Sequence, residues 1–172
     1  MSHKVHVRLA RFATPIVALV VGLVAVPAGP ANASVAYYFM QARHSGLCGH
    51  VIPNGYVDQN RLIQAYCFES NHSLFALQPS DDGHYRLVVL GTGKCLDVIG
   101  ASQGDRAKIQ QYSCHSGWNQ QWDLRPTDSG YYQIVARHSQ KCMDVQGDYL
   151  TPGAYIWQFP CDLGDNQQFR FL

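Results

Sequence analysis

The sequence predicts an all-β protein built from three copies of one unit. Two observations lead to this prediction: six cysteines recur at fixed intervals, and short segments of alternating apolar and polar residues are separated by turn-forming clusters. After the first 33 residues, no long segment has the 3.6-residue periodicity of an amphipathic helix. The chain from residue 34 onward is therefore expected to consist of short strands.

The repeat is clearest in the cysteines. They form pairs whose partners are 19 positions apart, and successive pairs begin 47 residues apart (95 − 48 = 142 − 95 = 47). This spacing divides the chain into repeats of about 38–84, 85–131 and 132–172. Other positions recur in the same register, namely Tyr38, Tyr85 and Tyr132; Leu62, Ile109 and Ile156; Gln64, Gln111 and Gln158; and Phe75, Trp122 and Phe169.

The elements within a repeat are predicted to be strands. Residues 85–89 and 132–136 alternate in side-chain character and are rich in aromatic and β-branched residues, which is typical of half-buried strands. Clusters of Gly, Pro, Ser and Asp at 79–83, 127–130 and 151–153 mark turns. About four strands per repeat are expected, and the recurring aromatics at 75, 122 and 169 are interpreted as core residues.

The first 33 residues are predicted to be a secretory signal peptide. Lys4, Arg8 and Arg11 form a basic start, and the apolar run at 16–26 is too short to span a bilayer. An Ala-x-Ala sequence then places cleavage after Ala33. A membrane anchor is the alternative, but polar sequence follows the short run at once.

Residues 34–172 have the length of a single domain. Three of the 13 basic residues lie in the predicted signal peptide, which leaves 10 Lys and Arg against 12 Asp and Glu, a formal net charge of −2. No basic cluster is present, so neither nucleic acid nor membrane insertion is expected.

The repeat also selects a disulfide pattern. Six cysteines allow 15 connectivities, but only one gives every repeat the same local bridge. Such bridges form in oxidising compartments and would contribute about 3 kcal/mol each. Zinc binding is not favoured, because the chain has no Cys-x-x-Cys motif. The expected bridges are Cys48–Cys67, Cys95–Cys114 and Cys142–Cys161.

These motifs resemble the ricin B-chain lectin family. The second repeat reads CLDV at 95–98, IQQYSC at 109–114 and NQQW at 119–122; the third reads CMDV at 142–145, IWQFPC at 156–161 and NQQF at 166–169. The resemblance covers residues 34–172. It implies a β-trefoil, a six-stranded barrel closed at one end by three hairpins, with pseudo-three-fold symmetry.

In the second repeat, the resemblance implies a complete carbohydrate site. A carboxylate accepts hydrogen bonds from sugar hydroxyls, an amide both donates and accepts, and an aromatic ring covers the apolar face of a sugar. By position, Asp97 would accept from hydroxyls, Gln110 and Asn119 would add polar contacts, and Tyr112 would stack on the sugar. Gln120 would either hold Asp97 in place or touch the sugar.

The third repeat carries a similar set, with one change. Asp144, Phe159, Asn166 and Gln167 match the binding positions, and Trp157 replaces the first glutamine of the second site. This tryptophan would add contact area or narrow the pocket. A second carbohydrate site is expected here.

The first repeat departs from the pattern at every binding position. His50 replaces the aspartate, Ala65 replaces the stacking aromatic, and His72 and Ser73 replace the Asn-Gln pair. We expect this repeat to be structural.

The expected function is a secreted lectin without catalysis, metal or cofactor. Glycosidases use two carboxylates across one bond, whereas Asp97 and Asp144 are expected in separate pockets. The resemblance suggests galactose-type or xylan-type sugars on a polysaccharide or cell surface, with two sites adding avidity. A separate hydrolase or toxin is a possible partner. The alternative is a non-catalytic trefoil that binds a protein, as an inhibitor or as a targeting subunit.

Overall fold

The computed structural model describes residues 35–53 and 57–172. The predicted signal peptide and its cleavage after Ala33 lie outside these residues and stay a prediction. Within the described part of the chain, no helix is long and apolar enough to cross a membrane.

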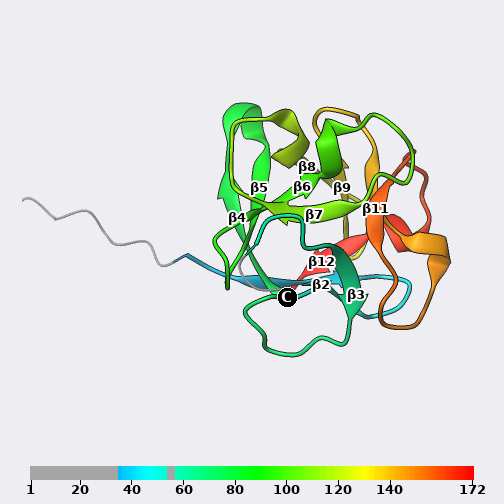
Figure 1. Ribbon diagram of the computed structural model, residues 1–172. Helices are drawn as coiled ribbons and strands as arrows, with labels where there is room; N and C mark the ends of the chain where they lie inside the picture. Colours follow the sequence, from blue (N-terminus) through cyan, green and yellow to red (C-terminus); the bar gives the residue numbers. More distant parts are fainter. Residues whose placement is uncertain (1–34, 54–56) are drawn as a thin grey trace, which may run out of the picture. The chain divides into compact units, whose positions relative to one another are not determined.

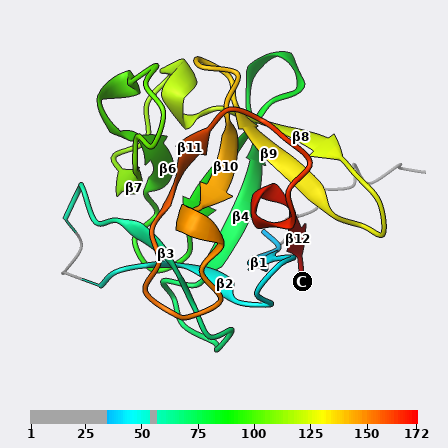
Figure 2. The same cartoon turned by 90° about the vertical axis from the view of Figure 1, so that its right-hand side faces the viewer.

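Six antiparallel strands close into a barrel (Figures 1 and 2). Each strand pairs with the next around the ring, and β12 returns to pair with β1, so the barrel has no free edge. The ring consists of β1 (Tyr38–Ala42), β4 (Leu74–Pro79), β5 (Tyr85–Val89), β8 (Trp122–Pro126), β9 (Tyr132–Ala136) and β12 (Phe169–Phe171).

Three hairpins are attached to this barrel, one from each repeat. Their inner strands lie around a common centre in Figure 1, where single bridges join Arg61 to Gln110, Lys108 to Trp157, and Tyr155 to Ile63. The predicted β-trefoil is thus confirmed. The hairpins are β2 (Cys48–Val51) with β3 (Leu62–Ala65), β6 (Cys95–Val98) with β7 (Ile109–Tyr112), and β10 (Cys142–Val145) with β11 (Ile156–Phe159).

Short 3-10 turns connect several strands. Two of them matter for the sites, because each follows a cysteine-containing loop and carries the Asn-Gln pair of its repeat. The five turns are η1 (Asp81–Gly83), η2 (Ile99–Ala101), η3 (Trp118–Gln120), η4 (Gln146–Asp148) and η5 (Asp165–Gln167).

The core contains one residue from each repeat at nearly every position. Phe75, Trp122 and Phe169 are fully buried in a single apolar cluster, as the repeat predicted. The indole of Trp122 also donates to the carbonyl of Leu96 at 3.3 Å, which satisfies its polar atom inside the core. Other sets of three in the cluster are Val51, Val98 and Val145; Leu62, Ile109 and Ile156; and Met40, Leu87 and Ile134.

The three predicted disulfides are present. Each joins the start of a hairpin to the loop that follows it, with Cα atoms 5.0 to 5.1 Å apart. No cysteine in the described residues is free. The bridges are Cys48–Cys67, Cys95–Cys114 and Cys142–Cys161.

A recurring buried glutamine fastens each repeat to its neighbour. The three glutamines are fully buried, and each donates through its Nε2 to backbone carbonyls in the hairpin loop of the preceding repeat. These loops are therefore held against the next repeat, where the candidate sites lie. The contacts are Gln111 to Val57 at 2.7 Å, Gln158 to Ser102 at 2.7 Å, and Gln64 to Thr151 at 2.8 Å.

Candidate functional site

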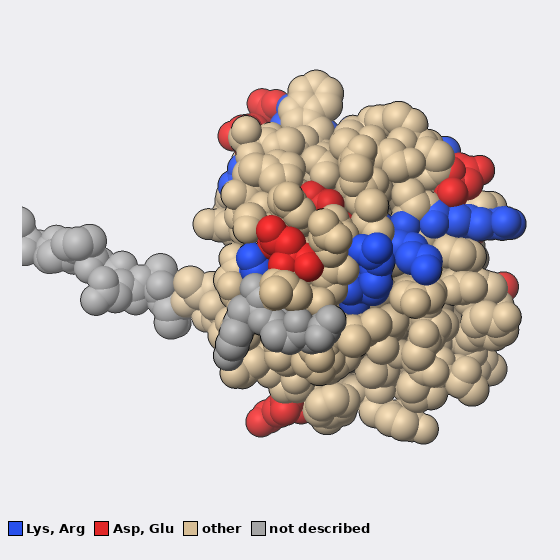
Figure 3. All heavy atoms as spheres, viewed as in Figure 1, with Lys and Arg blue, Asp and Glu red and all other residues tan. Residues whose placement is uncertain are grey.

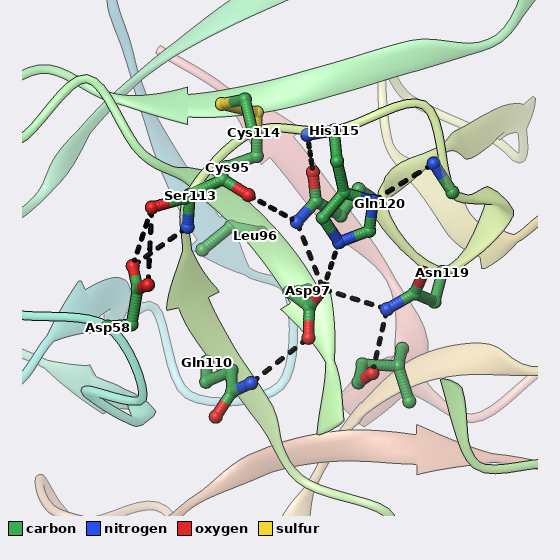
Figure 4. A network of polar contacts seen from close by, with 12 residues as sticks. Asp58, Cys95, Leu96, Asp97, Gln110, Ser113, Cys114, His115, Asn119 and Gln120 are labelled. Carbon is green, nitrogen blue, oxygen red and sulfur yellow. Dashed lines mark hydrogen bonds and ion pairs between the residues drawn. A yellow bond between two sulfur atoms is a disulfide. The ribbon is translucent and has the colours of Figure 1, made fainter. Parts of the chain in front are cut away.

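The second repeat gathers its polar motif residues around Asp97 (Figure 4). Antiparallel pairing of β6 with β7 sets Gln110 directly opposite Asp97, and the amide of Gln110 donates to Oδ1 at 3.1 Å. The turn η3 presents Asn119 and Gln120, which donate to Oδ2 at 2.7 and 3.0 Å. Strand pairing and one short turn thus bring together residues that are 23 positions apart.

Three amide donors hold the Asp97 carboxylate in a fixed orientation. The residue is only 3% exposed, and hydrogen bonds from neutral donors compensate for the loss of water around its charge. A carboxylate has about four acceptor positions, so one remains for a ligand hydroxyl. Asp97 has the geometry of a preorganised acceptor.

Gln120 lies behind the carboxylate. It is fully buried, donates to both Asp97 and the carbonyl of Ser113, and accepts from the backbone N–H of His115. It does not line the pocket. Of its two expected roles, the structure favours holding Asp97 over touching a ligand.

A pocket of about 480 Å³ opens in front of Asp97. Tyr112, Gln110 and Asn119, which the resemblance implied as sugar contacts, line this pocket. We call this cavity, with Asp97 at its base, the second pocket. Its remaining lining comes from η2 (Ile99, Gly100 and Ala101) and from Gln59, Arg61 and His115.

Two of these lining residues were not indicated by the motifs. The side chain of His115 is exposed, and its Nε2 lies 3.5 Å from Asp97 Oδ2. Arg61 reaches across from the first repeat and donates to Gln110 Oε1 at 2.7 Å. The second pocket is therefore built from two repeats.

The third repeat repeats this arrangement around Asp144. Asn166 and Gln167 donate to its Oδ2 at 3.0 and 2.9 Å, and the indole of Trp157 donates to Oδ1 at 2.5 Å. Trp157 thus replaces the amide donor of the second repeat. Gln167 is fully buried and does not line the cavity, like its counterpart Gln120.

The third pocket, with Asp144 at its base, has a volume of about 610 Å³. Phe159, Trp157 and Asn166 line it, together with the exposed ring of Tyr149. Arg106 from the second repeat lies over the rings of Trp157 and Phe159, at 5.9 and 5.8 Å from their centroids. A larger aromatic wall therefore borders this pocket.

The third pocket is more acidic than the second. Asp148 and Asp162 join Asp144 in its lining. Burial raises the pKa of Asp144 above its ordinary 3.8, and the neighbouring charges of Asp148 and Asp162 add to this, although hydrogen bonds from Gln167 and Trp157 act in the opposite direction.

The first repeat lacks the carboxylate and has a different contact in its place. His50 is buried, and its Nδ1 lies 2.7 Å from the hydroxyl of Ser73, which is fully buried. Burial lowers the pKa of His50, and nearby His72 lowers it further. The ring of His50 packs beside Phe68, with centroids 5.6 Å apart. This side chain is packed as a neutral structural residue.

Two preorganised carboxylates, each with an aromatic ring and amides at the mouth of a β-trefoil hairpin, define a lectin-type domain. A family model described as the ricin-type β-trefoil lectin domain matches residues 36–169. The chain therefore belongs to the ricin-type β-trefoil lectin family.

Solved structures agree with this assignment. The designed three-fold symmetric protein ThreeFoil is 40% identical, with a TM-score of 0.77 over 79% of this chain and 97% of its own. An exo-β-1,3-galactanase from Clostridium thermocellum is 26% identical, with a TM-score of 0.78 over 81% of this chain. The match covers only 30% of the galactanase. The Rhizoctonia solani agglutinin, at 11% identity, shares the fold with a TM-score of 0.73, over 84% of this chain and 99% of its own. A search of curated proteins gave no match.

Proposed function

We propose that the protein is a secreted lectin that binds galactose-type or xylan-type glycans without catalysis. The observation that supports this best is the preorganised Asp97, which is buried, hydrogen-bonded by three neutral amides and open to a pocket bordered by Tyr112. Such a group accepts hydrogen bonds from ligand hydroxyls while the ring covers an apolar face.

Asp144 supplies a second, separate site on the same rigid barrel. Single sugar sites are weak, and millimolar affinity corresponds to only about −4 kcal/mol. Two sites that engage one polysaccharide or one cell surface gain roughly 10² to 10⁴ in avidity. Binding in two pockets therefore suits a protein that attaches to extended glycans.

Secretion is supported by the three disulfides, which persist in oxidising compartments. A non-catalytic role is supported by the way the carboxylates are used. The oxygens of Asp97 and Asp144 are held by fixed donors, and the two residues line different pockets. We include a separate hydrolase or toxin as a partner that such a domain would direct to a glycan surface.

A glycan array tests this proposal. We expect the protein to bind galactose-type or xylan-type glycans, and Asp97→Ala or Asp144→Ala each to weaken the binding by roughly 10² to 10⁴, because the avidity of two sites is lost. The double variant is expected to lose binding. Failure of the folded protein to bind any glycan would support the alternative, a trefoil that binds a protein partner.

A matched control lies in the first repeat. Ser73→Ala alters the equivalent of the Asn-Gln pair without touching either pocket. Its glycan binding is expected to equal that of the unaltered protein once folding has been verified by circular dichroism. Loss of binding in this control would mean that the first repeat takes part in binding, contrary to the proposed sites.

A further inference from the structure

The two pockets differ in the charge of their linings. The second pocket contains one carboxylate, Asp97, and one arginine, Arg61, so its formal charge is zero with His115 neutral. The third pocket contains three aspartates and a single arginine, which leaves a formal charge of −2. A charged ligand is therefore expected to have different affinities for the two pockets.

Arg61 has no compensating carboxylate. Its Nη1 donates to Gln110 Oε1 at 2.7 Å and to the carbonyl of Gln59 at 3.0 Å, both neutral acceptors. Among the residues that the structure describes, Arg61 forms no ion pair, whereas half of the basic side chains do. Those paired with aspartates are Arg43, Lys94, Arg125, Arg137 and Lys141.

The position of Arg61 is specific to the second pocket. The equivalent residue at the third pocket is Lys108, whose bridge partner is Trp157 and not a glutamine. Its Nζ lies 3.7 Å from the centroid of the Tyr155 ring. At the first repeat the equivalent is Tyr155 itself, which carries no positive charge. Within residues 35–53 and 57–172, a link from arginine through glutamine to a buried aspartate occurs only in the second pocket.

Figure 3 shows the charged side chains on one face of the molecule. Lys and Arg side chains gather on the face that carries the three hairpins, close to the middle of the view. Arg61 and Lys108 directly precede the inner hairpin strands β3 and β7 and form two of the single bridges around one centre. An anionic group on a ligand in the second pocket would thus meet positive charge as it extends towards this centre.

We propose that the second pocket takes an acidic saccharide, one that carries a carboxylate or a sulfate group, and that Arg61 pairs with that group. This inference rests on the proposed lectin function. Asp97 holds hydroxyls of the bound sugar, while the planar guanidinium offers parallel donors that match a carboxylate or sulfate. The three aspartates of the third pocket repel the same ligand, which gives the two pockets different preferences.

Calorimetric titration with matched oligosaccharides tests this proposal. The ligands share one backbone and are neutral, carboxylated as a uronate, or sulfated. In Asp144→Ala, where only the second pocket remains, we expect an acidic form to bind about tenfold more tightly than the neutral form. The preference should shrink as salt is added. The better of the two acidic forms identifies the group that Arg61 recognises.

Two variants separate recognition from positioning. Arg61→Gln should abolish the preference for acidic ligands, and Arg61→Lys should keep part of it, since charge remains but the planar donors are lost. Arg125→Gln, which alters a distant pair with Asp123, should keep the full preference. If Arg61→Gln instead weakens neutral and acidic ligands equally, Arg61 only positions Gln110, and the inference is overturned.

The remaining outcomes are equally decisive. Equal affinity for acidic and neutral ligands would overturn the inference and leave the lectin function intact. Absence of binding to every ligand would overturn the proposed function itself. Should Asp144→Ala fail to fold, amide shifts near Gln110 and Asn119 in the unaltered protein report on the second pocket alone, and the same comparison of ligands applies.

Discussion

In the core of the first repeat, a glycine on one strand lies beside a large side chain on the neighbouring strand. Gly49 on β2 occupies the position of Leu96 and Met143 in the other repeats. Met40 on β1 is fully buried, and a Cβ added to Gly49 would lie only 2.6 Å from its terminal Cε. The Met40 side chain therefore occupies the space that a side chain at position 49 fills elsewhere.

The magnitude follows from this contact. We predict that Gly49→Ala destabilises the protein by about 1–3 kcal/mol through overpacking. Met40→Leu shortens this side chain, so that no methyl group lies above Gly49. The small cavity that remains should cost about 1 kcal/mol. In the double variant the alanine methyl occupies that cavity, and the backbone at Gly49 is not left-handed, so alanine adds no backbone strain.

A double-mutant cycle measures this coupling. Urea unfolding of the four proteins, followed by tryptophan fluorescence, should leave the double variant close to the unaltered protein. The favourable interaction energy then equals the sum of the two single costs, about 2–4 kcal/mol. Single costs that add within about 0.5 kcal/mol would refute the reasoning, because they would mean that Met40 does not fill the space above Gly49.

Three further predictions concern the pockets and their frame. Because burial raises the pKa of Asp144, its carboxylate should titrate above 3.8 by carbon NMR, and third-pocket binding should fall as the pH drops through that value; titration at or below 3.8 would contradict this. By linkage, folding favours protonated Asp144, so its contribution to stability declines as the pH rises through the raised pKa. Replacing Cys95 and Cys114 by alanine should cost about 3 kcal/mol in urea unfolding, and an unchanged midpoint would contradict the bridge's role. Gln111→Ala leaves the carbonyl of Val57 without its buried donor and should cost about 1–3 kcal/mol. Thr92→Val removes the hydroxyl that donates to Gln111 and accepts from the Lys94 N–H at 3.3 Å, and it should cost less.

The repeat made much of the fold predictable. Trp122 recurs as Phe75 and Phe169 at fixed intervals, and an apolar aromatic that recurs even in the degenerate repeat serves the core. Cysteine spacing predicted the bridges for the same reason, since equal loops in equal units take equal cross-links. The motif spacing placed Asp97, Gln110, Asn119 and Gln120 at one site, because strand pairing and a short turn are local to one repeat. That Gln110 and Asn119 donate to the carboxylate itself was not predicted.

Contacts between repeats were not predictable in this way. Arg61 reaches the second pocket, and Arg106 the third, only because buried glutamines hold each hairpin loop against the following repeat. The sequence showed that Gln64, Gln111 and Gln158 recur. It did not show that each donates to the hairpin loop of the preceding repeat. The approach of His115 to the Asp97 carboxylate was not predictable either, because it depends on the fold of the loop after Cys114.

The measurement that bears most directly on function is amide chemical-shift mapping of the protein with a saturating glycan from the array. Two clusters of shifts are predicted, one around Asp97 and Asn119 and one around Asp144 and Asn166, with the residues around His50 unchanged. Shifts centred on His50, or shifts confined to surfaces away from both pockets, would contradict glycan binding by the second and third repeats.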